Sequence, residues 1–323
     1  MPAVRVSPEV AAAVADGRPV VALESTVFSR LGLPGPAGAE ALRRSLDVVR
    51  EAGAVAALTV VLDGEPRVGV DDGELPRLLA AERKAAERDL AVAAAQRWPA
   101  AATTVSASLA LAAAAGVTVF ATGGIGGVHR EWADSGDESA DLGALARHPV
   151  VTVCAGVKAF LDVPRTLERL ETLGVTVIGV GADGGEFPAF WSRRSGRAVP
   201  HPLHSTAEAA DVIRAARELG QRSGILVVTP VPEAFEVPAA ALGPVIEAAL
   251  AEAAGAGVTG GAVTPFVLDR IAAATGGRTV AANVALMEHN AAVAAALAAA
   301  LAAGAAPDGG AGSRPDGRRQ MRT

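Results

Sequence analysis

The sequence has one cysteine, two lysines, two asparagines and no tyrosine among its 323 residues. The single cysteine, Cys154, excludes an internal disulfide and a metal site built from several thiolates. A formal net charge of −6 excludes the strongly basic surface that binds nucleic acid. The N-terminus lacks the basic and then apolar pattern of a signal peptide. The longest apolar run, near residues 291–306, is almost all alanine and too weakly hydrophobic to predict a membrane span.

The residues that are present predict a packed globular protein. Hydrophobic residues make up 50% of the chain and charged residues 20%, which excludes disorder over most of its length. The scarcity of cysteine fits a reducing compartment. We therefore expect a cytoplasmic enzyme that binds neither nucleic acid nor a membrane.

Lysine is depleted although basic residues are common. Lys84 and Lys158 are the two lysines among 29 basic residues, and the others are arginine. Compositional drift of the gene toward alanine, glycine, arginine and valine explains this depletion. A lysine that stays is a candidate for chemistry that a guanidinium cannot perform, such as losing a proton and attacking a carbonyl. Chance survival of both lysines is the alternative.

Short valine-rich segments alternate with helical ones, which is typical of an α/β fold with a largely parallel sheet covered on both faces. We expect one domain over residues 5–303 and a disordered tail over 304–323, which is rich in Gly, Pro, Asp and Arg. The expected strands are 19–23, 54–64, 67–70, 117–122, 149–156, 175–181 and 224–232. The expected helices are 8–16, 37–52, 74–95, 103–115, 164–173, 205–219, 240–255, 264–275 and 280–303.

Three of the expected strands end at residues that suggest chemistry. Glu24 follows the first, the glycine run 123–127 follows the fourth, and Lys158 follows the fifth. Ligands of open α/β sheets bind at the carboxyl ends of the strands. The sequence therefore predicts a site at this edge of the sheet.

Each candidate also has a plainer interpretation. Glu24 is either a general acid whose pKa is raised by partial burial or a carboxylate that caps a turn. The glycine run, followed by His129 and Arg130, either brings backbone amides close to a phosphate or forms a flexible loop. Its spacing does not match the dinucleotide-binding fingerprint. Lys158 has small or apolar neighbours that would disfavour the charged ammonium, or it is a structural lysine whose amine reaches solvent.

A polar stretch after the glycine run holds four carboxylates. Such a stretch is either a solvated acidic loop or a site for a magnesium- or manganese-like cation, which takes one or two carboxylates and keeps its waters. No Cys/His cluster has the ligand spacing of zinc. We expect Cys154 to be a core residue, and His201 and His204 to be surface or loop residues and not ligands. The four carboxylates are Asp134, Asp137, Glu138 and Asp141.

Seven motifs follow one another in an order that is typical of one family. They are VALEST at 21–26, ATTV at 102–105, VFATGGIGGVHR at 119–130, SADL at 139–142, VVTVCAGVKAFLDVPRTLE at 150–168, EFPAF at 186–190 and TPFVL at 264–268. Over about residues 5–300 the chain resembles the pseudouridine-5'-phosphate glycosidase family, also called the indigoidine-synthase-A-like family. That resemblance implies a three-layer α/β/α fold and a homotrimer. It also implies reversible cleavage of the C–C glycosidic bond of pseudouridine 5'-phosphate, a small-molecule substrate, to uracil and ribose 5-phosphate.

The resemblance also implies roles for individual residues. Lys158 matches the nucleophile, which forms an imine with the ring-opened sugar, and Glu24 matches the proton donor. Asp137 matches the ligand of a divalent cation, usually Mn2+, with one ion per subunit. Seven further positions match residues that contact the substrate or lie in segments facing the site: Lys84, Val105, His129, Ser139, Ala140, Asp141 and Asn283.

Three segments depart from the family pattern, one of them TPVP at 229–232, where the family has Asn-Pro-Ile-Pro. The family usually has Ser-His-Gly-Met-Pro where this chain has SRLGLP at 29–34, and commonly Lys-Val-Ser-Arg-Arg-Asp where this chain has KAAERD at 84–89. These changes favour, as an alternative, a related lyase that acts on another phosphorylated C-nucleoside. A non-catalytic paralogue is a third hypothesis, which predicts loss of Lys158 or Glu24, and both are present.

Overall fold

The strands of the protein form one largely parallel sheet. The computed structural model of the chain describes residues 4–181, 185–258 and 263–304. Nine of the strands follow the order β1-β4-β3-β2-β7-β8-β11-β9-β10, and β6 pairs with both β3 and β5. Among the described strands, only β3 with β4 and β3 with β6 pair antiparallel. The strands are β1 Arg5–Val6, β2 Val20–Leu23, β3 Val55–Leu62, β4 Glu65–Val68, β5 Lys84–Ala85, β6 Ala100–Thr103, β7 Val119–Ala121, β8 Val151–Cys154, β9 Thr176–Val180, β10 His201–Leu203 and β11 Ile225–Val228.

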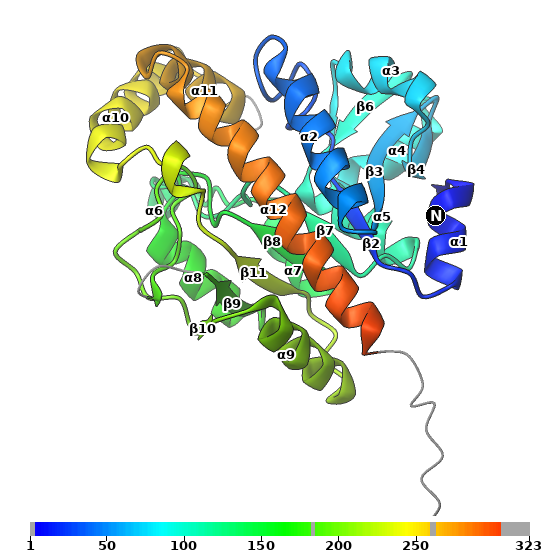
Figure 1. Ribbon diagram of the computed structural model, residues 1–323. Coiled ribbons are helices and arrows are strands. Elements are labelled where there is room, and N and C mark those ends of the chain that lie inside the picture. Colours follow the sequence, from blue (N-terminus) through cyan, green and yellow to red (C-terminus); the bar gives the residue numbers. More distant parts are fainter. Residues whose placement is uncertain (1–3, 182–184, 259–262, 305–323) are drawn as a thin grey trace, which may run out of the picture.

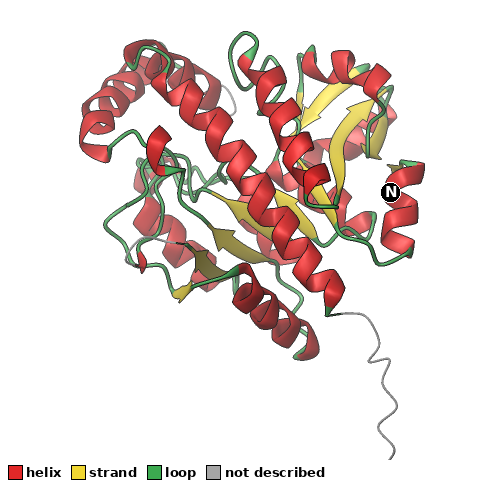
Figure 2. Ribbon diagram, in the orientation of Figure 1, coloured by secondary structure: helices red, strands yellow, loops and turns green. Residues whose placement is uncertain are grey.

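Helices cover both faces of the sheet, so the expected three layers are confirmed (Figures 1 and 2). One layer holds α2, α12 and α9, which lie side by side, and the other holds α5, α7 and α8. Every residue of β2, β8 and β11 is buried, as expected of strands covered on both sides. The α-helices are α1 Pro8–Ala15, α2 Ala37–Glu51, α3 Leu75–Leu79, α4 Leu90–Ala95, α5 Val105–Ala114, α6 Trp132–Ser135, α7 Ala140–Arg147, α8 Val163–Thr172, α9 Thr206–Glu218, α10 Ala239–Gly255, α11 Val263–Ala274 and α12 Arg278–Ala303.

Helix α12 is the one described helix that is long and apolar enough, by length and composition, to cross a membrane. In the fold it packs against β2, β7 and β8 and lies between α2 and α9. Alanine, leucine and methionine side chains on most of its length are buried there. A helix that is apolar all round is typical of a protein core as well as of a membrane span.

The prediction of one helix over 74–95 is wrong. This segment contains the 3-10 helix η1 (Asp72–Glu74), α3, the short strand β5, the 3-10 helix η2 (Glu87–Asp89) and α4. Lys84 and Ala85 pair in parallel with β6, a strand that the sequence did not predict either. Helix α7 and the strands β1 and β10 were also not expected. The predicted tail lies outside the described residues from 305 onward.

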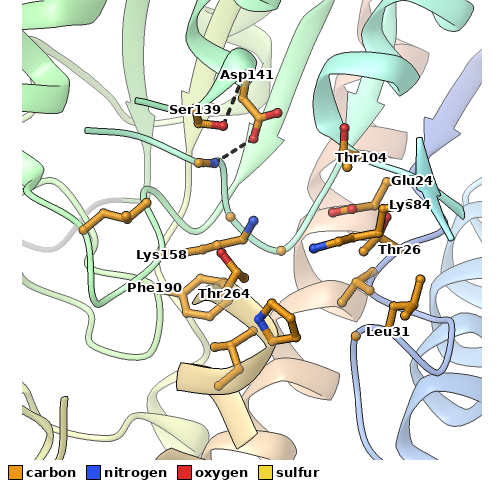
Figure 3. A pocket seen from close by; sticks show the side chains of 18 of the residues that line it. Glu24, Thr26, Leu31, Lys84, Thr104, Ser139, Asp141, Lys158, Phe190 and Thr264 are labelled. Atoms are coloured by element: carbon orange, nitrogen blue, oxygen red, sulfur yellow. Dashed lines mark hydrogen bonds between the residues drawn. The ribbon is translucent and has the colours of Figure 1, made fainter. Parts of the chain in front are cut away.

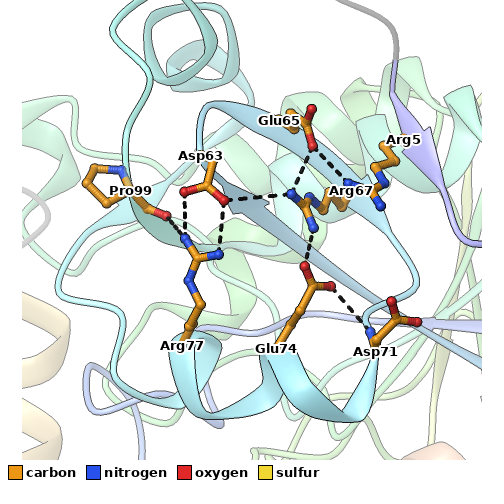
Figure 4. A network of polar contacts seen from close by, with 8 residues as sticks. All are labelled: Arg5, Asp63, Glu65, Arg67, Asp71, Glu74, Arg77 and Pro99. Carbon is orange, nitrogen blue, oxygen red and sulfur yellow. Dashed lines mark hydrogen bonds and ion pairs between the residues drawn. The ribbon is translucent and has the colours of Figure 1, made fainter.

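A polar network holds the β3–β4 hairpin against α3, shortly before β5 (Figure 4). Arg67 is only 5% exposed, and its guanidinium donates to Glu65 at 2.8 Å and to Glu74. Arg77 donates to both carboxylate oxygens of Asp63, at 2.7 and 2.9 Å. Because α3 leads into the strand that carries Lys84, this network helps to fix one wall of the site described next.

Candidate functional site

The carboxyl ends of β2, β7 and β8 open into a cavity of about 710 Å³, where the sequence predicts a site (Figure 3). Figure 3 shows the carboxylate of Glu24 and the amines of Lys84 and Lys158 directed into the same space. Nine of the ten residues singled out for catalysis, substrate or metal line the cavity, namely Glu24, Lys84, His129, Asp137, Ser139, Ala140, Asp141, Lys158 and Asn283.

The tenth residue, Val105, is not among the lining residues. It is 1% exposed at the first position of α5, and its neighbours Thr104 and Ser106 line the cavity in its place. The Val105 side chain therefore packs in the core. Contact between Val105 and a ligand would have to use its backbone.

Glu24 is buried at the point where β2 ends. It is 7% exposed and accepts a hydrogen bond from the Thr122 hydroxyl at the end of β7. Burial raises the pKa of Glu24 above its ordinary value of 4.5, and the charge of Asp141 adds to the rise, while Lys158 and Thr122 oppose it. A carboxyl group in this state can hold a proton and deliver it inside the cavity.

The two lysines approach the cavity from different strands. The Lys158 backbone amide donates to Ile125 at 3.1 Å, which joins the segment after β8 to the glycine run. The charged sequence neighbours of Lys84, among them Arg83 and Glu87, predict a solvated ammonium, and the predicted full solvation is wrong. Lys84 is half-buried in β5, and desolvation, together with the positive charge of Lys158, lowers its pKa. The Lys84 amine therefore lies in a setting that disfavours its charge.

The glycine run packs closely against neighbouring segments, and some amides in and beside it are bonded within the protein. The amides of Ile125 and His129 donate to backbone carbonyls, and that of Gly126 donates to Oδ2 of Asp141 at 2.8 Å. A Cβ at Gly126 would lie 2.2 Å from the Ser139 hydroxyl, and one at Gly124 would lie 2.6 Å from the Phe190 ring. Glycine is required at these two positions because the segments of Ser139 and Phe190 approach the loop this closely.

Helix α7 begins beside the glycine run, at the three predicted substrate-contacting residues Ser139, Ala140 and Asp141. Ser139 caps the helix, since its hydroxyl accepts from the Asp141 amide at 3.2 Å. Asp141 is 5% exposed and accepts from the amides of Gly126 and of Ser106, the latter at 3.1 Å. Asp141 is thus a buried carboxylate that joins α5, α7 and the glycine run at the cavity.

Asp137 is the carboxylate of the acidic stretch best placed for a cation. Its side chain is 43% exposed, and Oδ2 lies 3.8 Å from Nε2 of His129. Glu138 is engaged by Arg169, and Asp134 is exposed away from the cavity lining. Among the described residues, no group of three or more His, Cys, Asp or Glu side chains converges on a metal position. One available carboxylate suits a hard cation that keeps most of its waters.

The cavity also contains residues that the sequence did not single out. Phe190 and Trp191 line it, and Thr122, which is not itself a lining residue, donates a hydrogen bond to Glu24. Asn283, which the resemblance did single out, reaches the cavity from α12 and is 8% exposed. Phe190 ends the EFPAF motif, which contributed only to the resemblance, and Trp191 follows that motif directly.

The remaining candidates behave as expected. Cys154 is fully buried, and burial raises its pKa to about 12, so its thiol stays protonated. His201 and His204 are exposed and do not line the cavity, although His201 belongs to a short strand and not to a loop. Neither histidine is placed for catalysis.

Residues of the departing segments 29–34 and 84–89 line the cavity. Arg30 forms an ion pair with Glu82 at 2.6 Å, and its backbone amide donates to Leu79. Glu87 turns away from the cavity and binds Arg147 at 2.6 Å and His148 at 2.9 Å. The carboxylate of Glu87 therefore does not confront an anion bound in the cavity.

Comparisons with known proteins agree with this architecture. A protein of Nocardioides sp. called pseudouridine-5'-phosphate glycosidase is 47% identical over 299 residues, which cover 92% of this chain and 96% of the relative. One of the same name from Deinococcus radiodurans is 49% identical over 295 residues, or 90% of this chain and 93% of the relative.

Two solved structures share the fold. The prealnumycin C-glycosynthase AlnA, in complex with ribulose 5-phosphate, superposes with a TM-score of 0.85 at 34% identity, covering 94% of this chain and 98% of that chain. An indigoidine synthase A-like protein from Thermotoga maritima gives a TM-score of 0.83 at 34% identity, with 93% and 96% coverage. The family described as indigoidine synthase A like protein matches residues 9–300, and this chain belongs to it.

Proposed function

We propose that the protein reversibly cleaves the C–C glycosidic bond of pseudouridine 5'-phosphate to uracil and ribose 5-phosphate. One observation carries the proposal: the buried Glu24, whose pKa is raised, lies in the same cavity as both lysines. Relatives 47–49% identical over nine-tenths of the chain carry the name of that activity. A paired-carboxylate mechanism for O-glycosides does not suffice here, because the bond to uracil has no leaving-group oxygen.

Glu24 and Lys158 divide the chemistry between them. Glu24 gives its proton to the ring oxygen of the ribose, and the ring opens at C1. The Lys158 amine bonds to C1 through its lone pair, and the resulting ammonium loses a proton to the Glu24 carboxylate. The freed lone pair forms C=N as the C–C bond breaks, its electron pair leaves with uracil, and Glu24 returns the proton to that uracil carbon. Water then hydrolyses the imine, which releases ribose 5-phosphate and restores the amine. Arginine cannot replace Lys158 in this scheme, because it does not deprotonate.

The phosphate supplies binding energy that positions the sugar. Lys84 is the cation assigned to it, with His129 and Asn283 on the surrounding walls. Burial and the charge of Lys158 lower the pKa of Lys84. A bound phosphate dianion would offset this effect, because its negative charge stabilises the ammonium form of Lys84. Asp141, Ser139 and Ala140 line the part of the cavity beside the glycine run and are assigned to the rest of the substrate.

Asp137 is assigned to a divalent cation, with Mn2+ as the expected ion. Its half-exposed carboxylate at the cavity fits an ion that keeps most of its waters. When bound, the cation would supply positive charge that holds uracil or its ordered waters by electrostatics. We further assign the protein to the cytoplasm and expect it to be a homotrimer. Light scattering tests the assembly, because a trimer has about three times the 32.2 kDa mass of one chain.

The direct test is turnover of pseudouridine 5'-phosphate, followed as release of uracil by chromatography. The purified wild type is expected to release uracil, and Lys158→Arg is expected to fold with the same melting temperature but release none. A panel of other phosphorylated C-nucleosides tests the related-lyase alternative, which the altered rim at 29–34 favours. Faster turnover of another member of the panel would show that this compound, and not pseudouridine 5'-phosphate, is the preferred substrate. Near wild-type turnover by Lys158→Arg would exclude the covalent mechanism.

A further inference from the structure

The amide of Asn283 has a fixed orientation at the cavity wall. The indole Nε1 of Trp191 donates to Oδ1 of Asn283 at 2.9 Å. An indole N–H can only donate, so the amide atom facing it must be the oxygen, which removes the usual ambiguity between oxygen and nitrogen. Nδ2 therefore points away from the indole. No acceptor among the residues that the structure describes takes a hydrogen bond from Nδ2, and Asn283 lines the cavity.

Trp191 is itself held from several sides. It is 1% exposed, its carbonyl accepts from the Val237 amide at 2.9 Å, and its ring centroid lies 5.0 Å from that of Phe190. Phe190 adopts a φ of 63°, in the left-handed region that a non-glycine residue rarely occupies, and its amide donates to Ala155 at 2.9 Å. The indole is therefore a rigid anchor, and the amide of Asn283 follows it.

We propose that Trp191 is a positioning residue for substrate binding. By holding Oδ1, it directs the two N–H donors of Asn283 toward a phosphate or hydroxyl oxygen of a sugar phosphate in the cavity. The reversed amide would present its oxygen to the same anionic group and repel it. This inference rests on the proposed function, because it takes a sugar phosphate as the ligand.

The test is calorimetric binding of ribose 5-phosphate to the wild type and to Trp191→Phe, which keeps most of the ring and removes the N–H. We expect the dissociation constant to rise about 3- to 10-fold, as loss of one hydrogen bond implies. In turnover, KM is expected to rise by a similar factor while kcat changes less than about twofold. The matched control is Trp98→Phe, since the Trp98 indole donates to the Gln96 amide at the same 2.9 Å outside the cavity lining.

A second pair of variants separates positioning from general packing. In the Asn283→Ala background, the further change Trp191→Phe is expected to have no additional effect on binding. An equal effect in both backgrounds, or unchanged binding by Trp191→Phe, would overturn the role of Trp191 and leave the proposed function standing. Absence of ribose 5-phosphate binding by the wild type would overturn both.

Discussion

Glu24 shows how one residue acquires a function from its surroundings. As a side chain at the end of β2 it has no special chemistry, but burial and the nearby Asp141 raise its pKa. The Thr122 hydroxyl bonds the carboxylate and opposes this rise. Because a hydrogen bond to the charged form favours that form, Thr122 sets how easily Glu24 gives up its proton.

Thr122→Val is expected to raise the pKa of Glu24 further, because it removes a donor to the carboxylate. The acid must be protonated to act, so the fall of kcat/KM at high pH is expected to move to higher pH. The measurement is the pH profile of kcat/KM. Thr118→Val, an exposed position just before the same strand, is the control and should leave the profile unchanged. A profile of Thr122→Val that stays in place or moves to lower pH would contradict the assignment of Glu24.

Glu24→Gln is expected to abolish turnover and yet to stabilise the fold at high pH. A carboxyl group whose folded pKa is raised contributes stability below its ordinary pKa of 4.5, and this contribution is lost as pH rises through the folded value. Glutamine bears no charge at any pH. The melting temperature of the variant should therefore exceed that of the wild type at pH 8 and approach it near pH 4. A variant that melts lower than the wild type at pH 8 would show that the charged carboxylate stabilises the fold.

At the scale of elements, the strands that carry the chemistry were predictable. The strands β2, β7 and β8 are short, valine-rich and fully buried, so each appears in the sequence as an apolar run that ends abruptly at a polar residue or glycine. The rule that ligands bind at the carboxyl ends of parallel strands then placed Glu24 and Lys158 together. The motif resemblance added the positions that lie on other elements, such as Asn283 on α12.

The elements that were missed depend on contacts distant in sequence. The segment 74–95 is rich in alanine and arginine, which favour a helix, but Lys84 and Ala85 form a strand because β6 offers them a pairing edge. The bond from Trp191 to Asn283 joins residues 92 positions apart, and no local pattern predicts it. The solvated setting predicted for Lys84 was wrong for the same reason, because the charges of its sequence neighbours do not show whether the fold buries the side chain.

Arg67→Ala tests the network that supports the wall around β5. Arg67 is buried, whereas its partners Glu65 and Glu74 are partly exposed and can return to water. We expect a loss of roughly 2 kcal/mol in the free energy of unfolding and a raised KM for the sugar phosphate. Arg5→Ala, which removes an exposed ion pair with Glu65, is the control and should cost about 0.5 kcal/mol or less. Equal unfolding midpoints in denaturant for Arg67→Ala and the wild type would contradict this role.

At the scale of the whole molecule, the cavity depends on segments that are far apart in the chain. The ends of β2 and β8 lead into the acid and one lysine, the short strand β5 carries the other lysine, and α11 and α12 contribute further lining residues. The acidic stretch that carries Asp137 reaches the same cavity through the loop that precedes α7.

Removal of divalent cations is expected to abolish turnover, and Mn2+ should restore it. In Asp137→Ala the restoration is expected to be poor, because the variant lacks the one available carboxylate of the acidic stretch. Asp134→Ala, an exposed neighbour outside the cavity lining, should respond as the wild type does. Full turnover in the presence of chelator, with no metal found by elemental analysis, would exclude a cation from the reaction.

The measurement that tests the account most directly is borohydride trapping with ribose 5-phosphate, followed by peptide mass spectrometry. The two lysines are both near Glu24, so the experiment decides which of them attacks the sugar. We predict one reduced sugar phosphate per chain, on the peptide that contains Lys158, in the wild type and also in Lys84→Ala at high sugar phosphate. An adduct on the peptide that contains Lys84, or an adduct that persists in Lys158→Arg, would contradict the account.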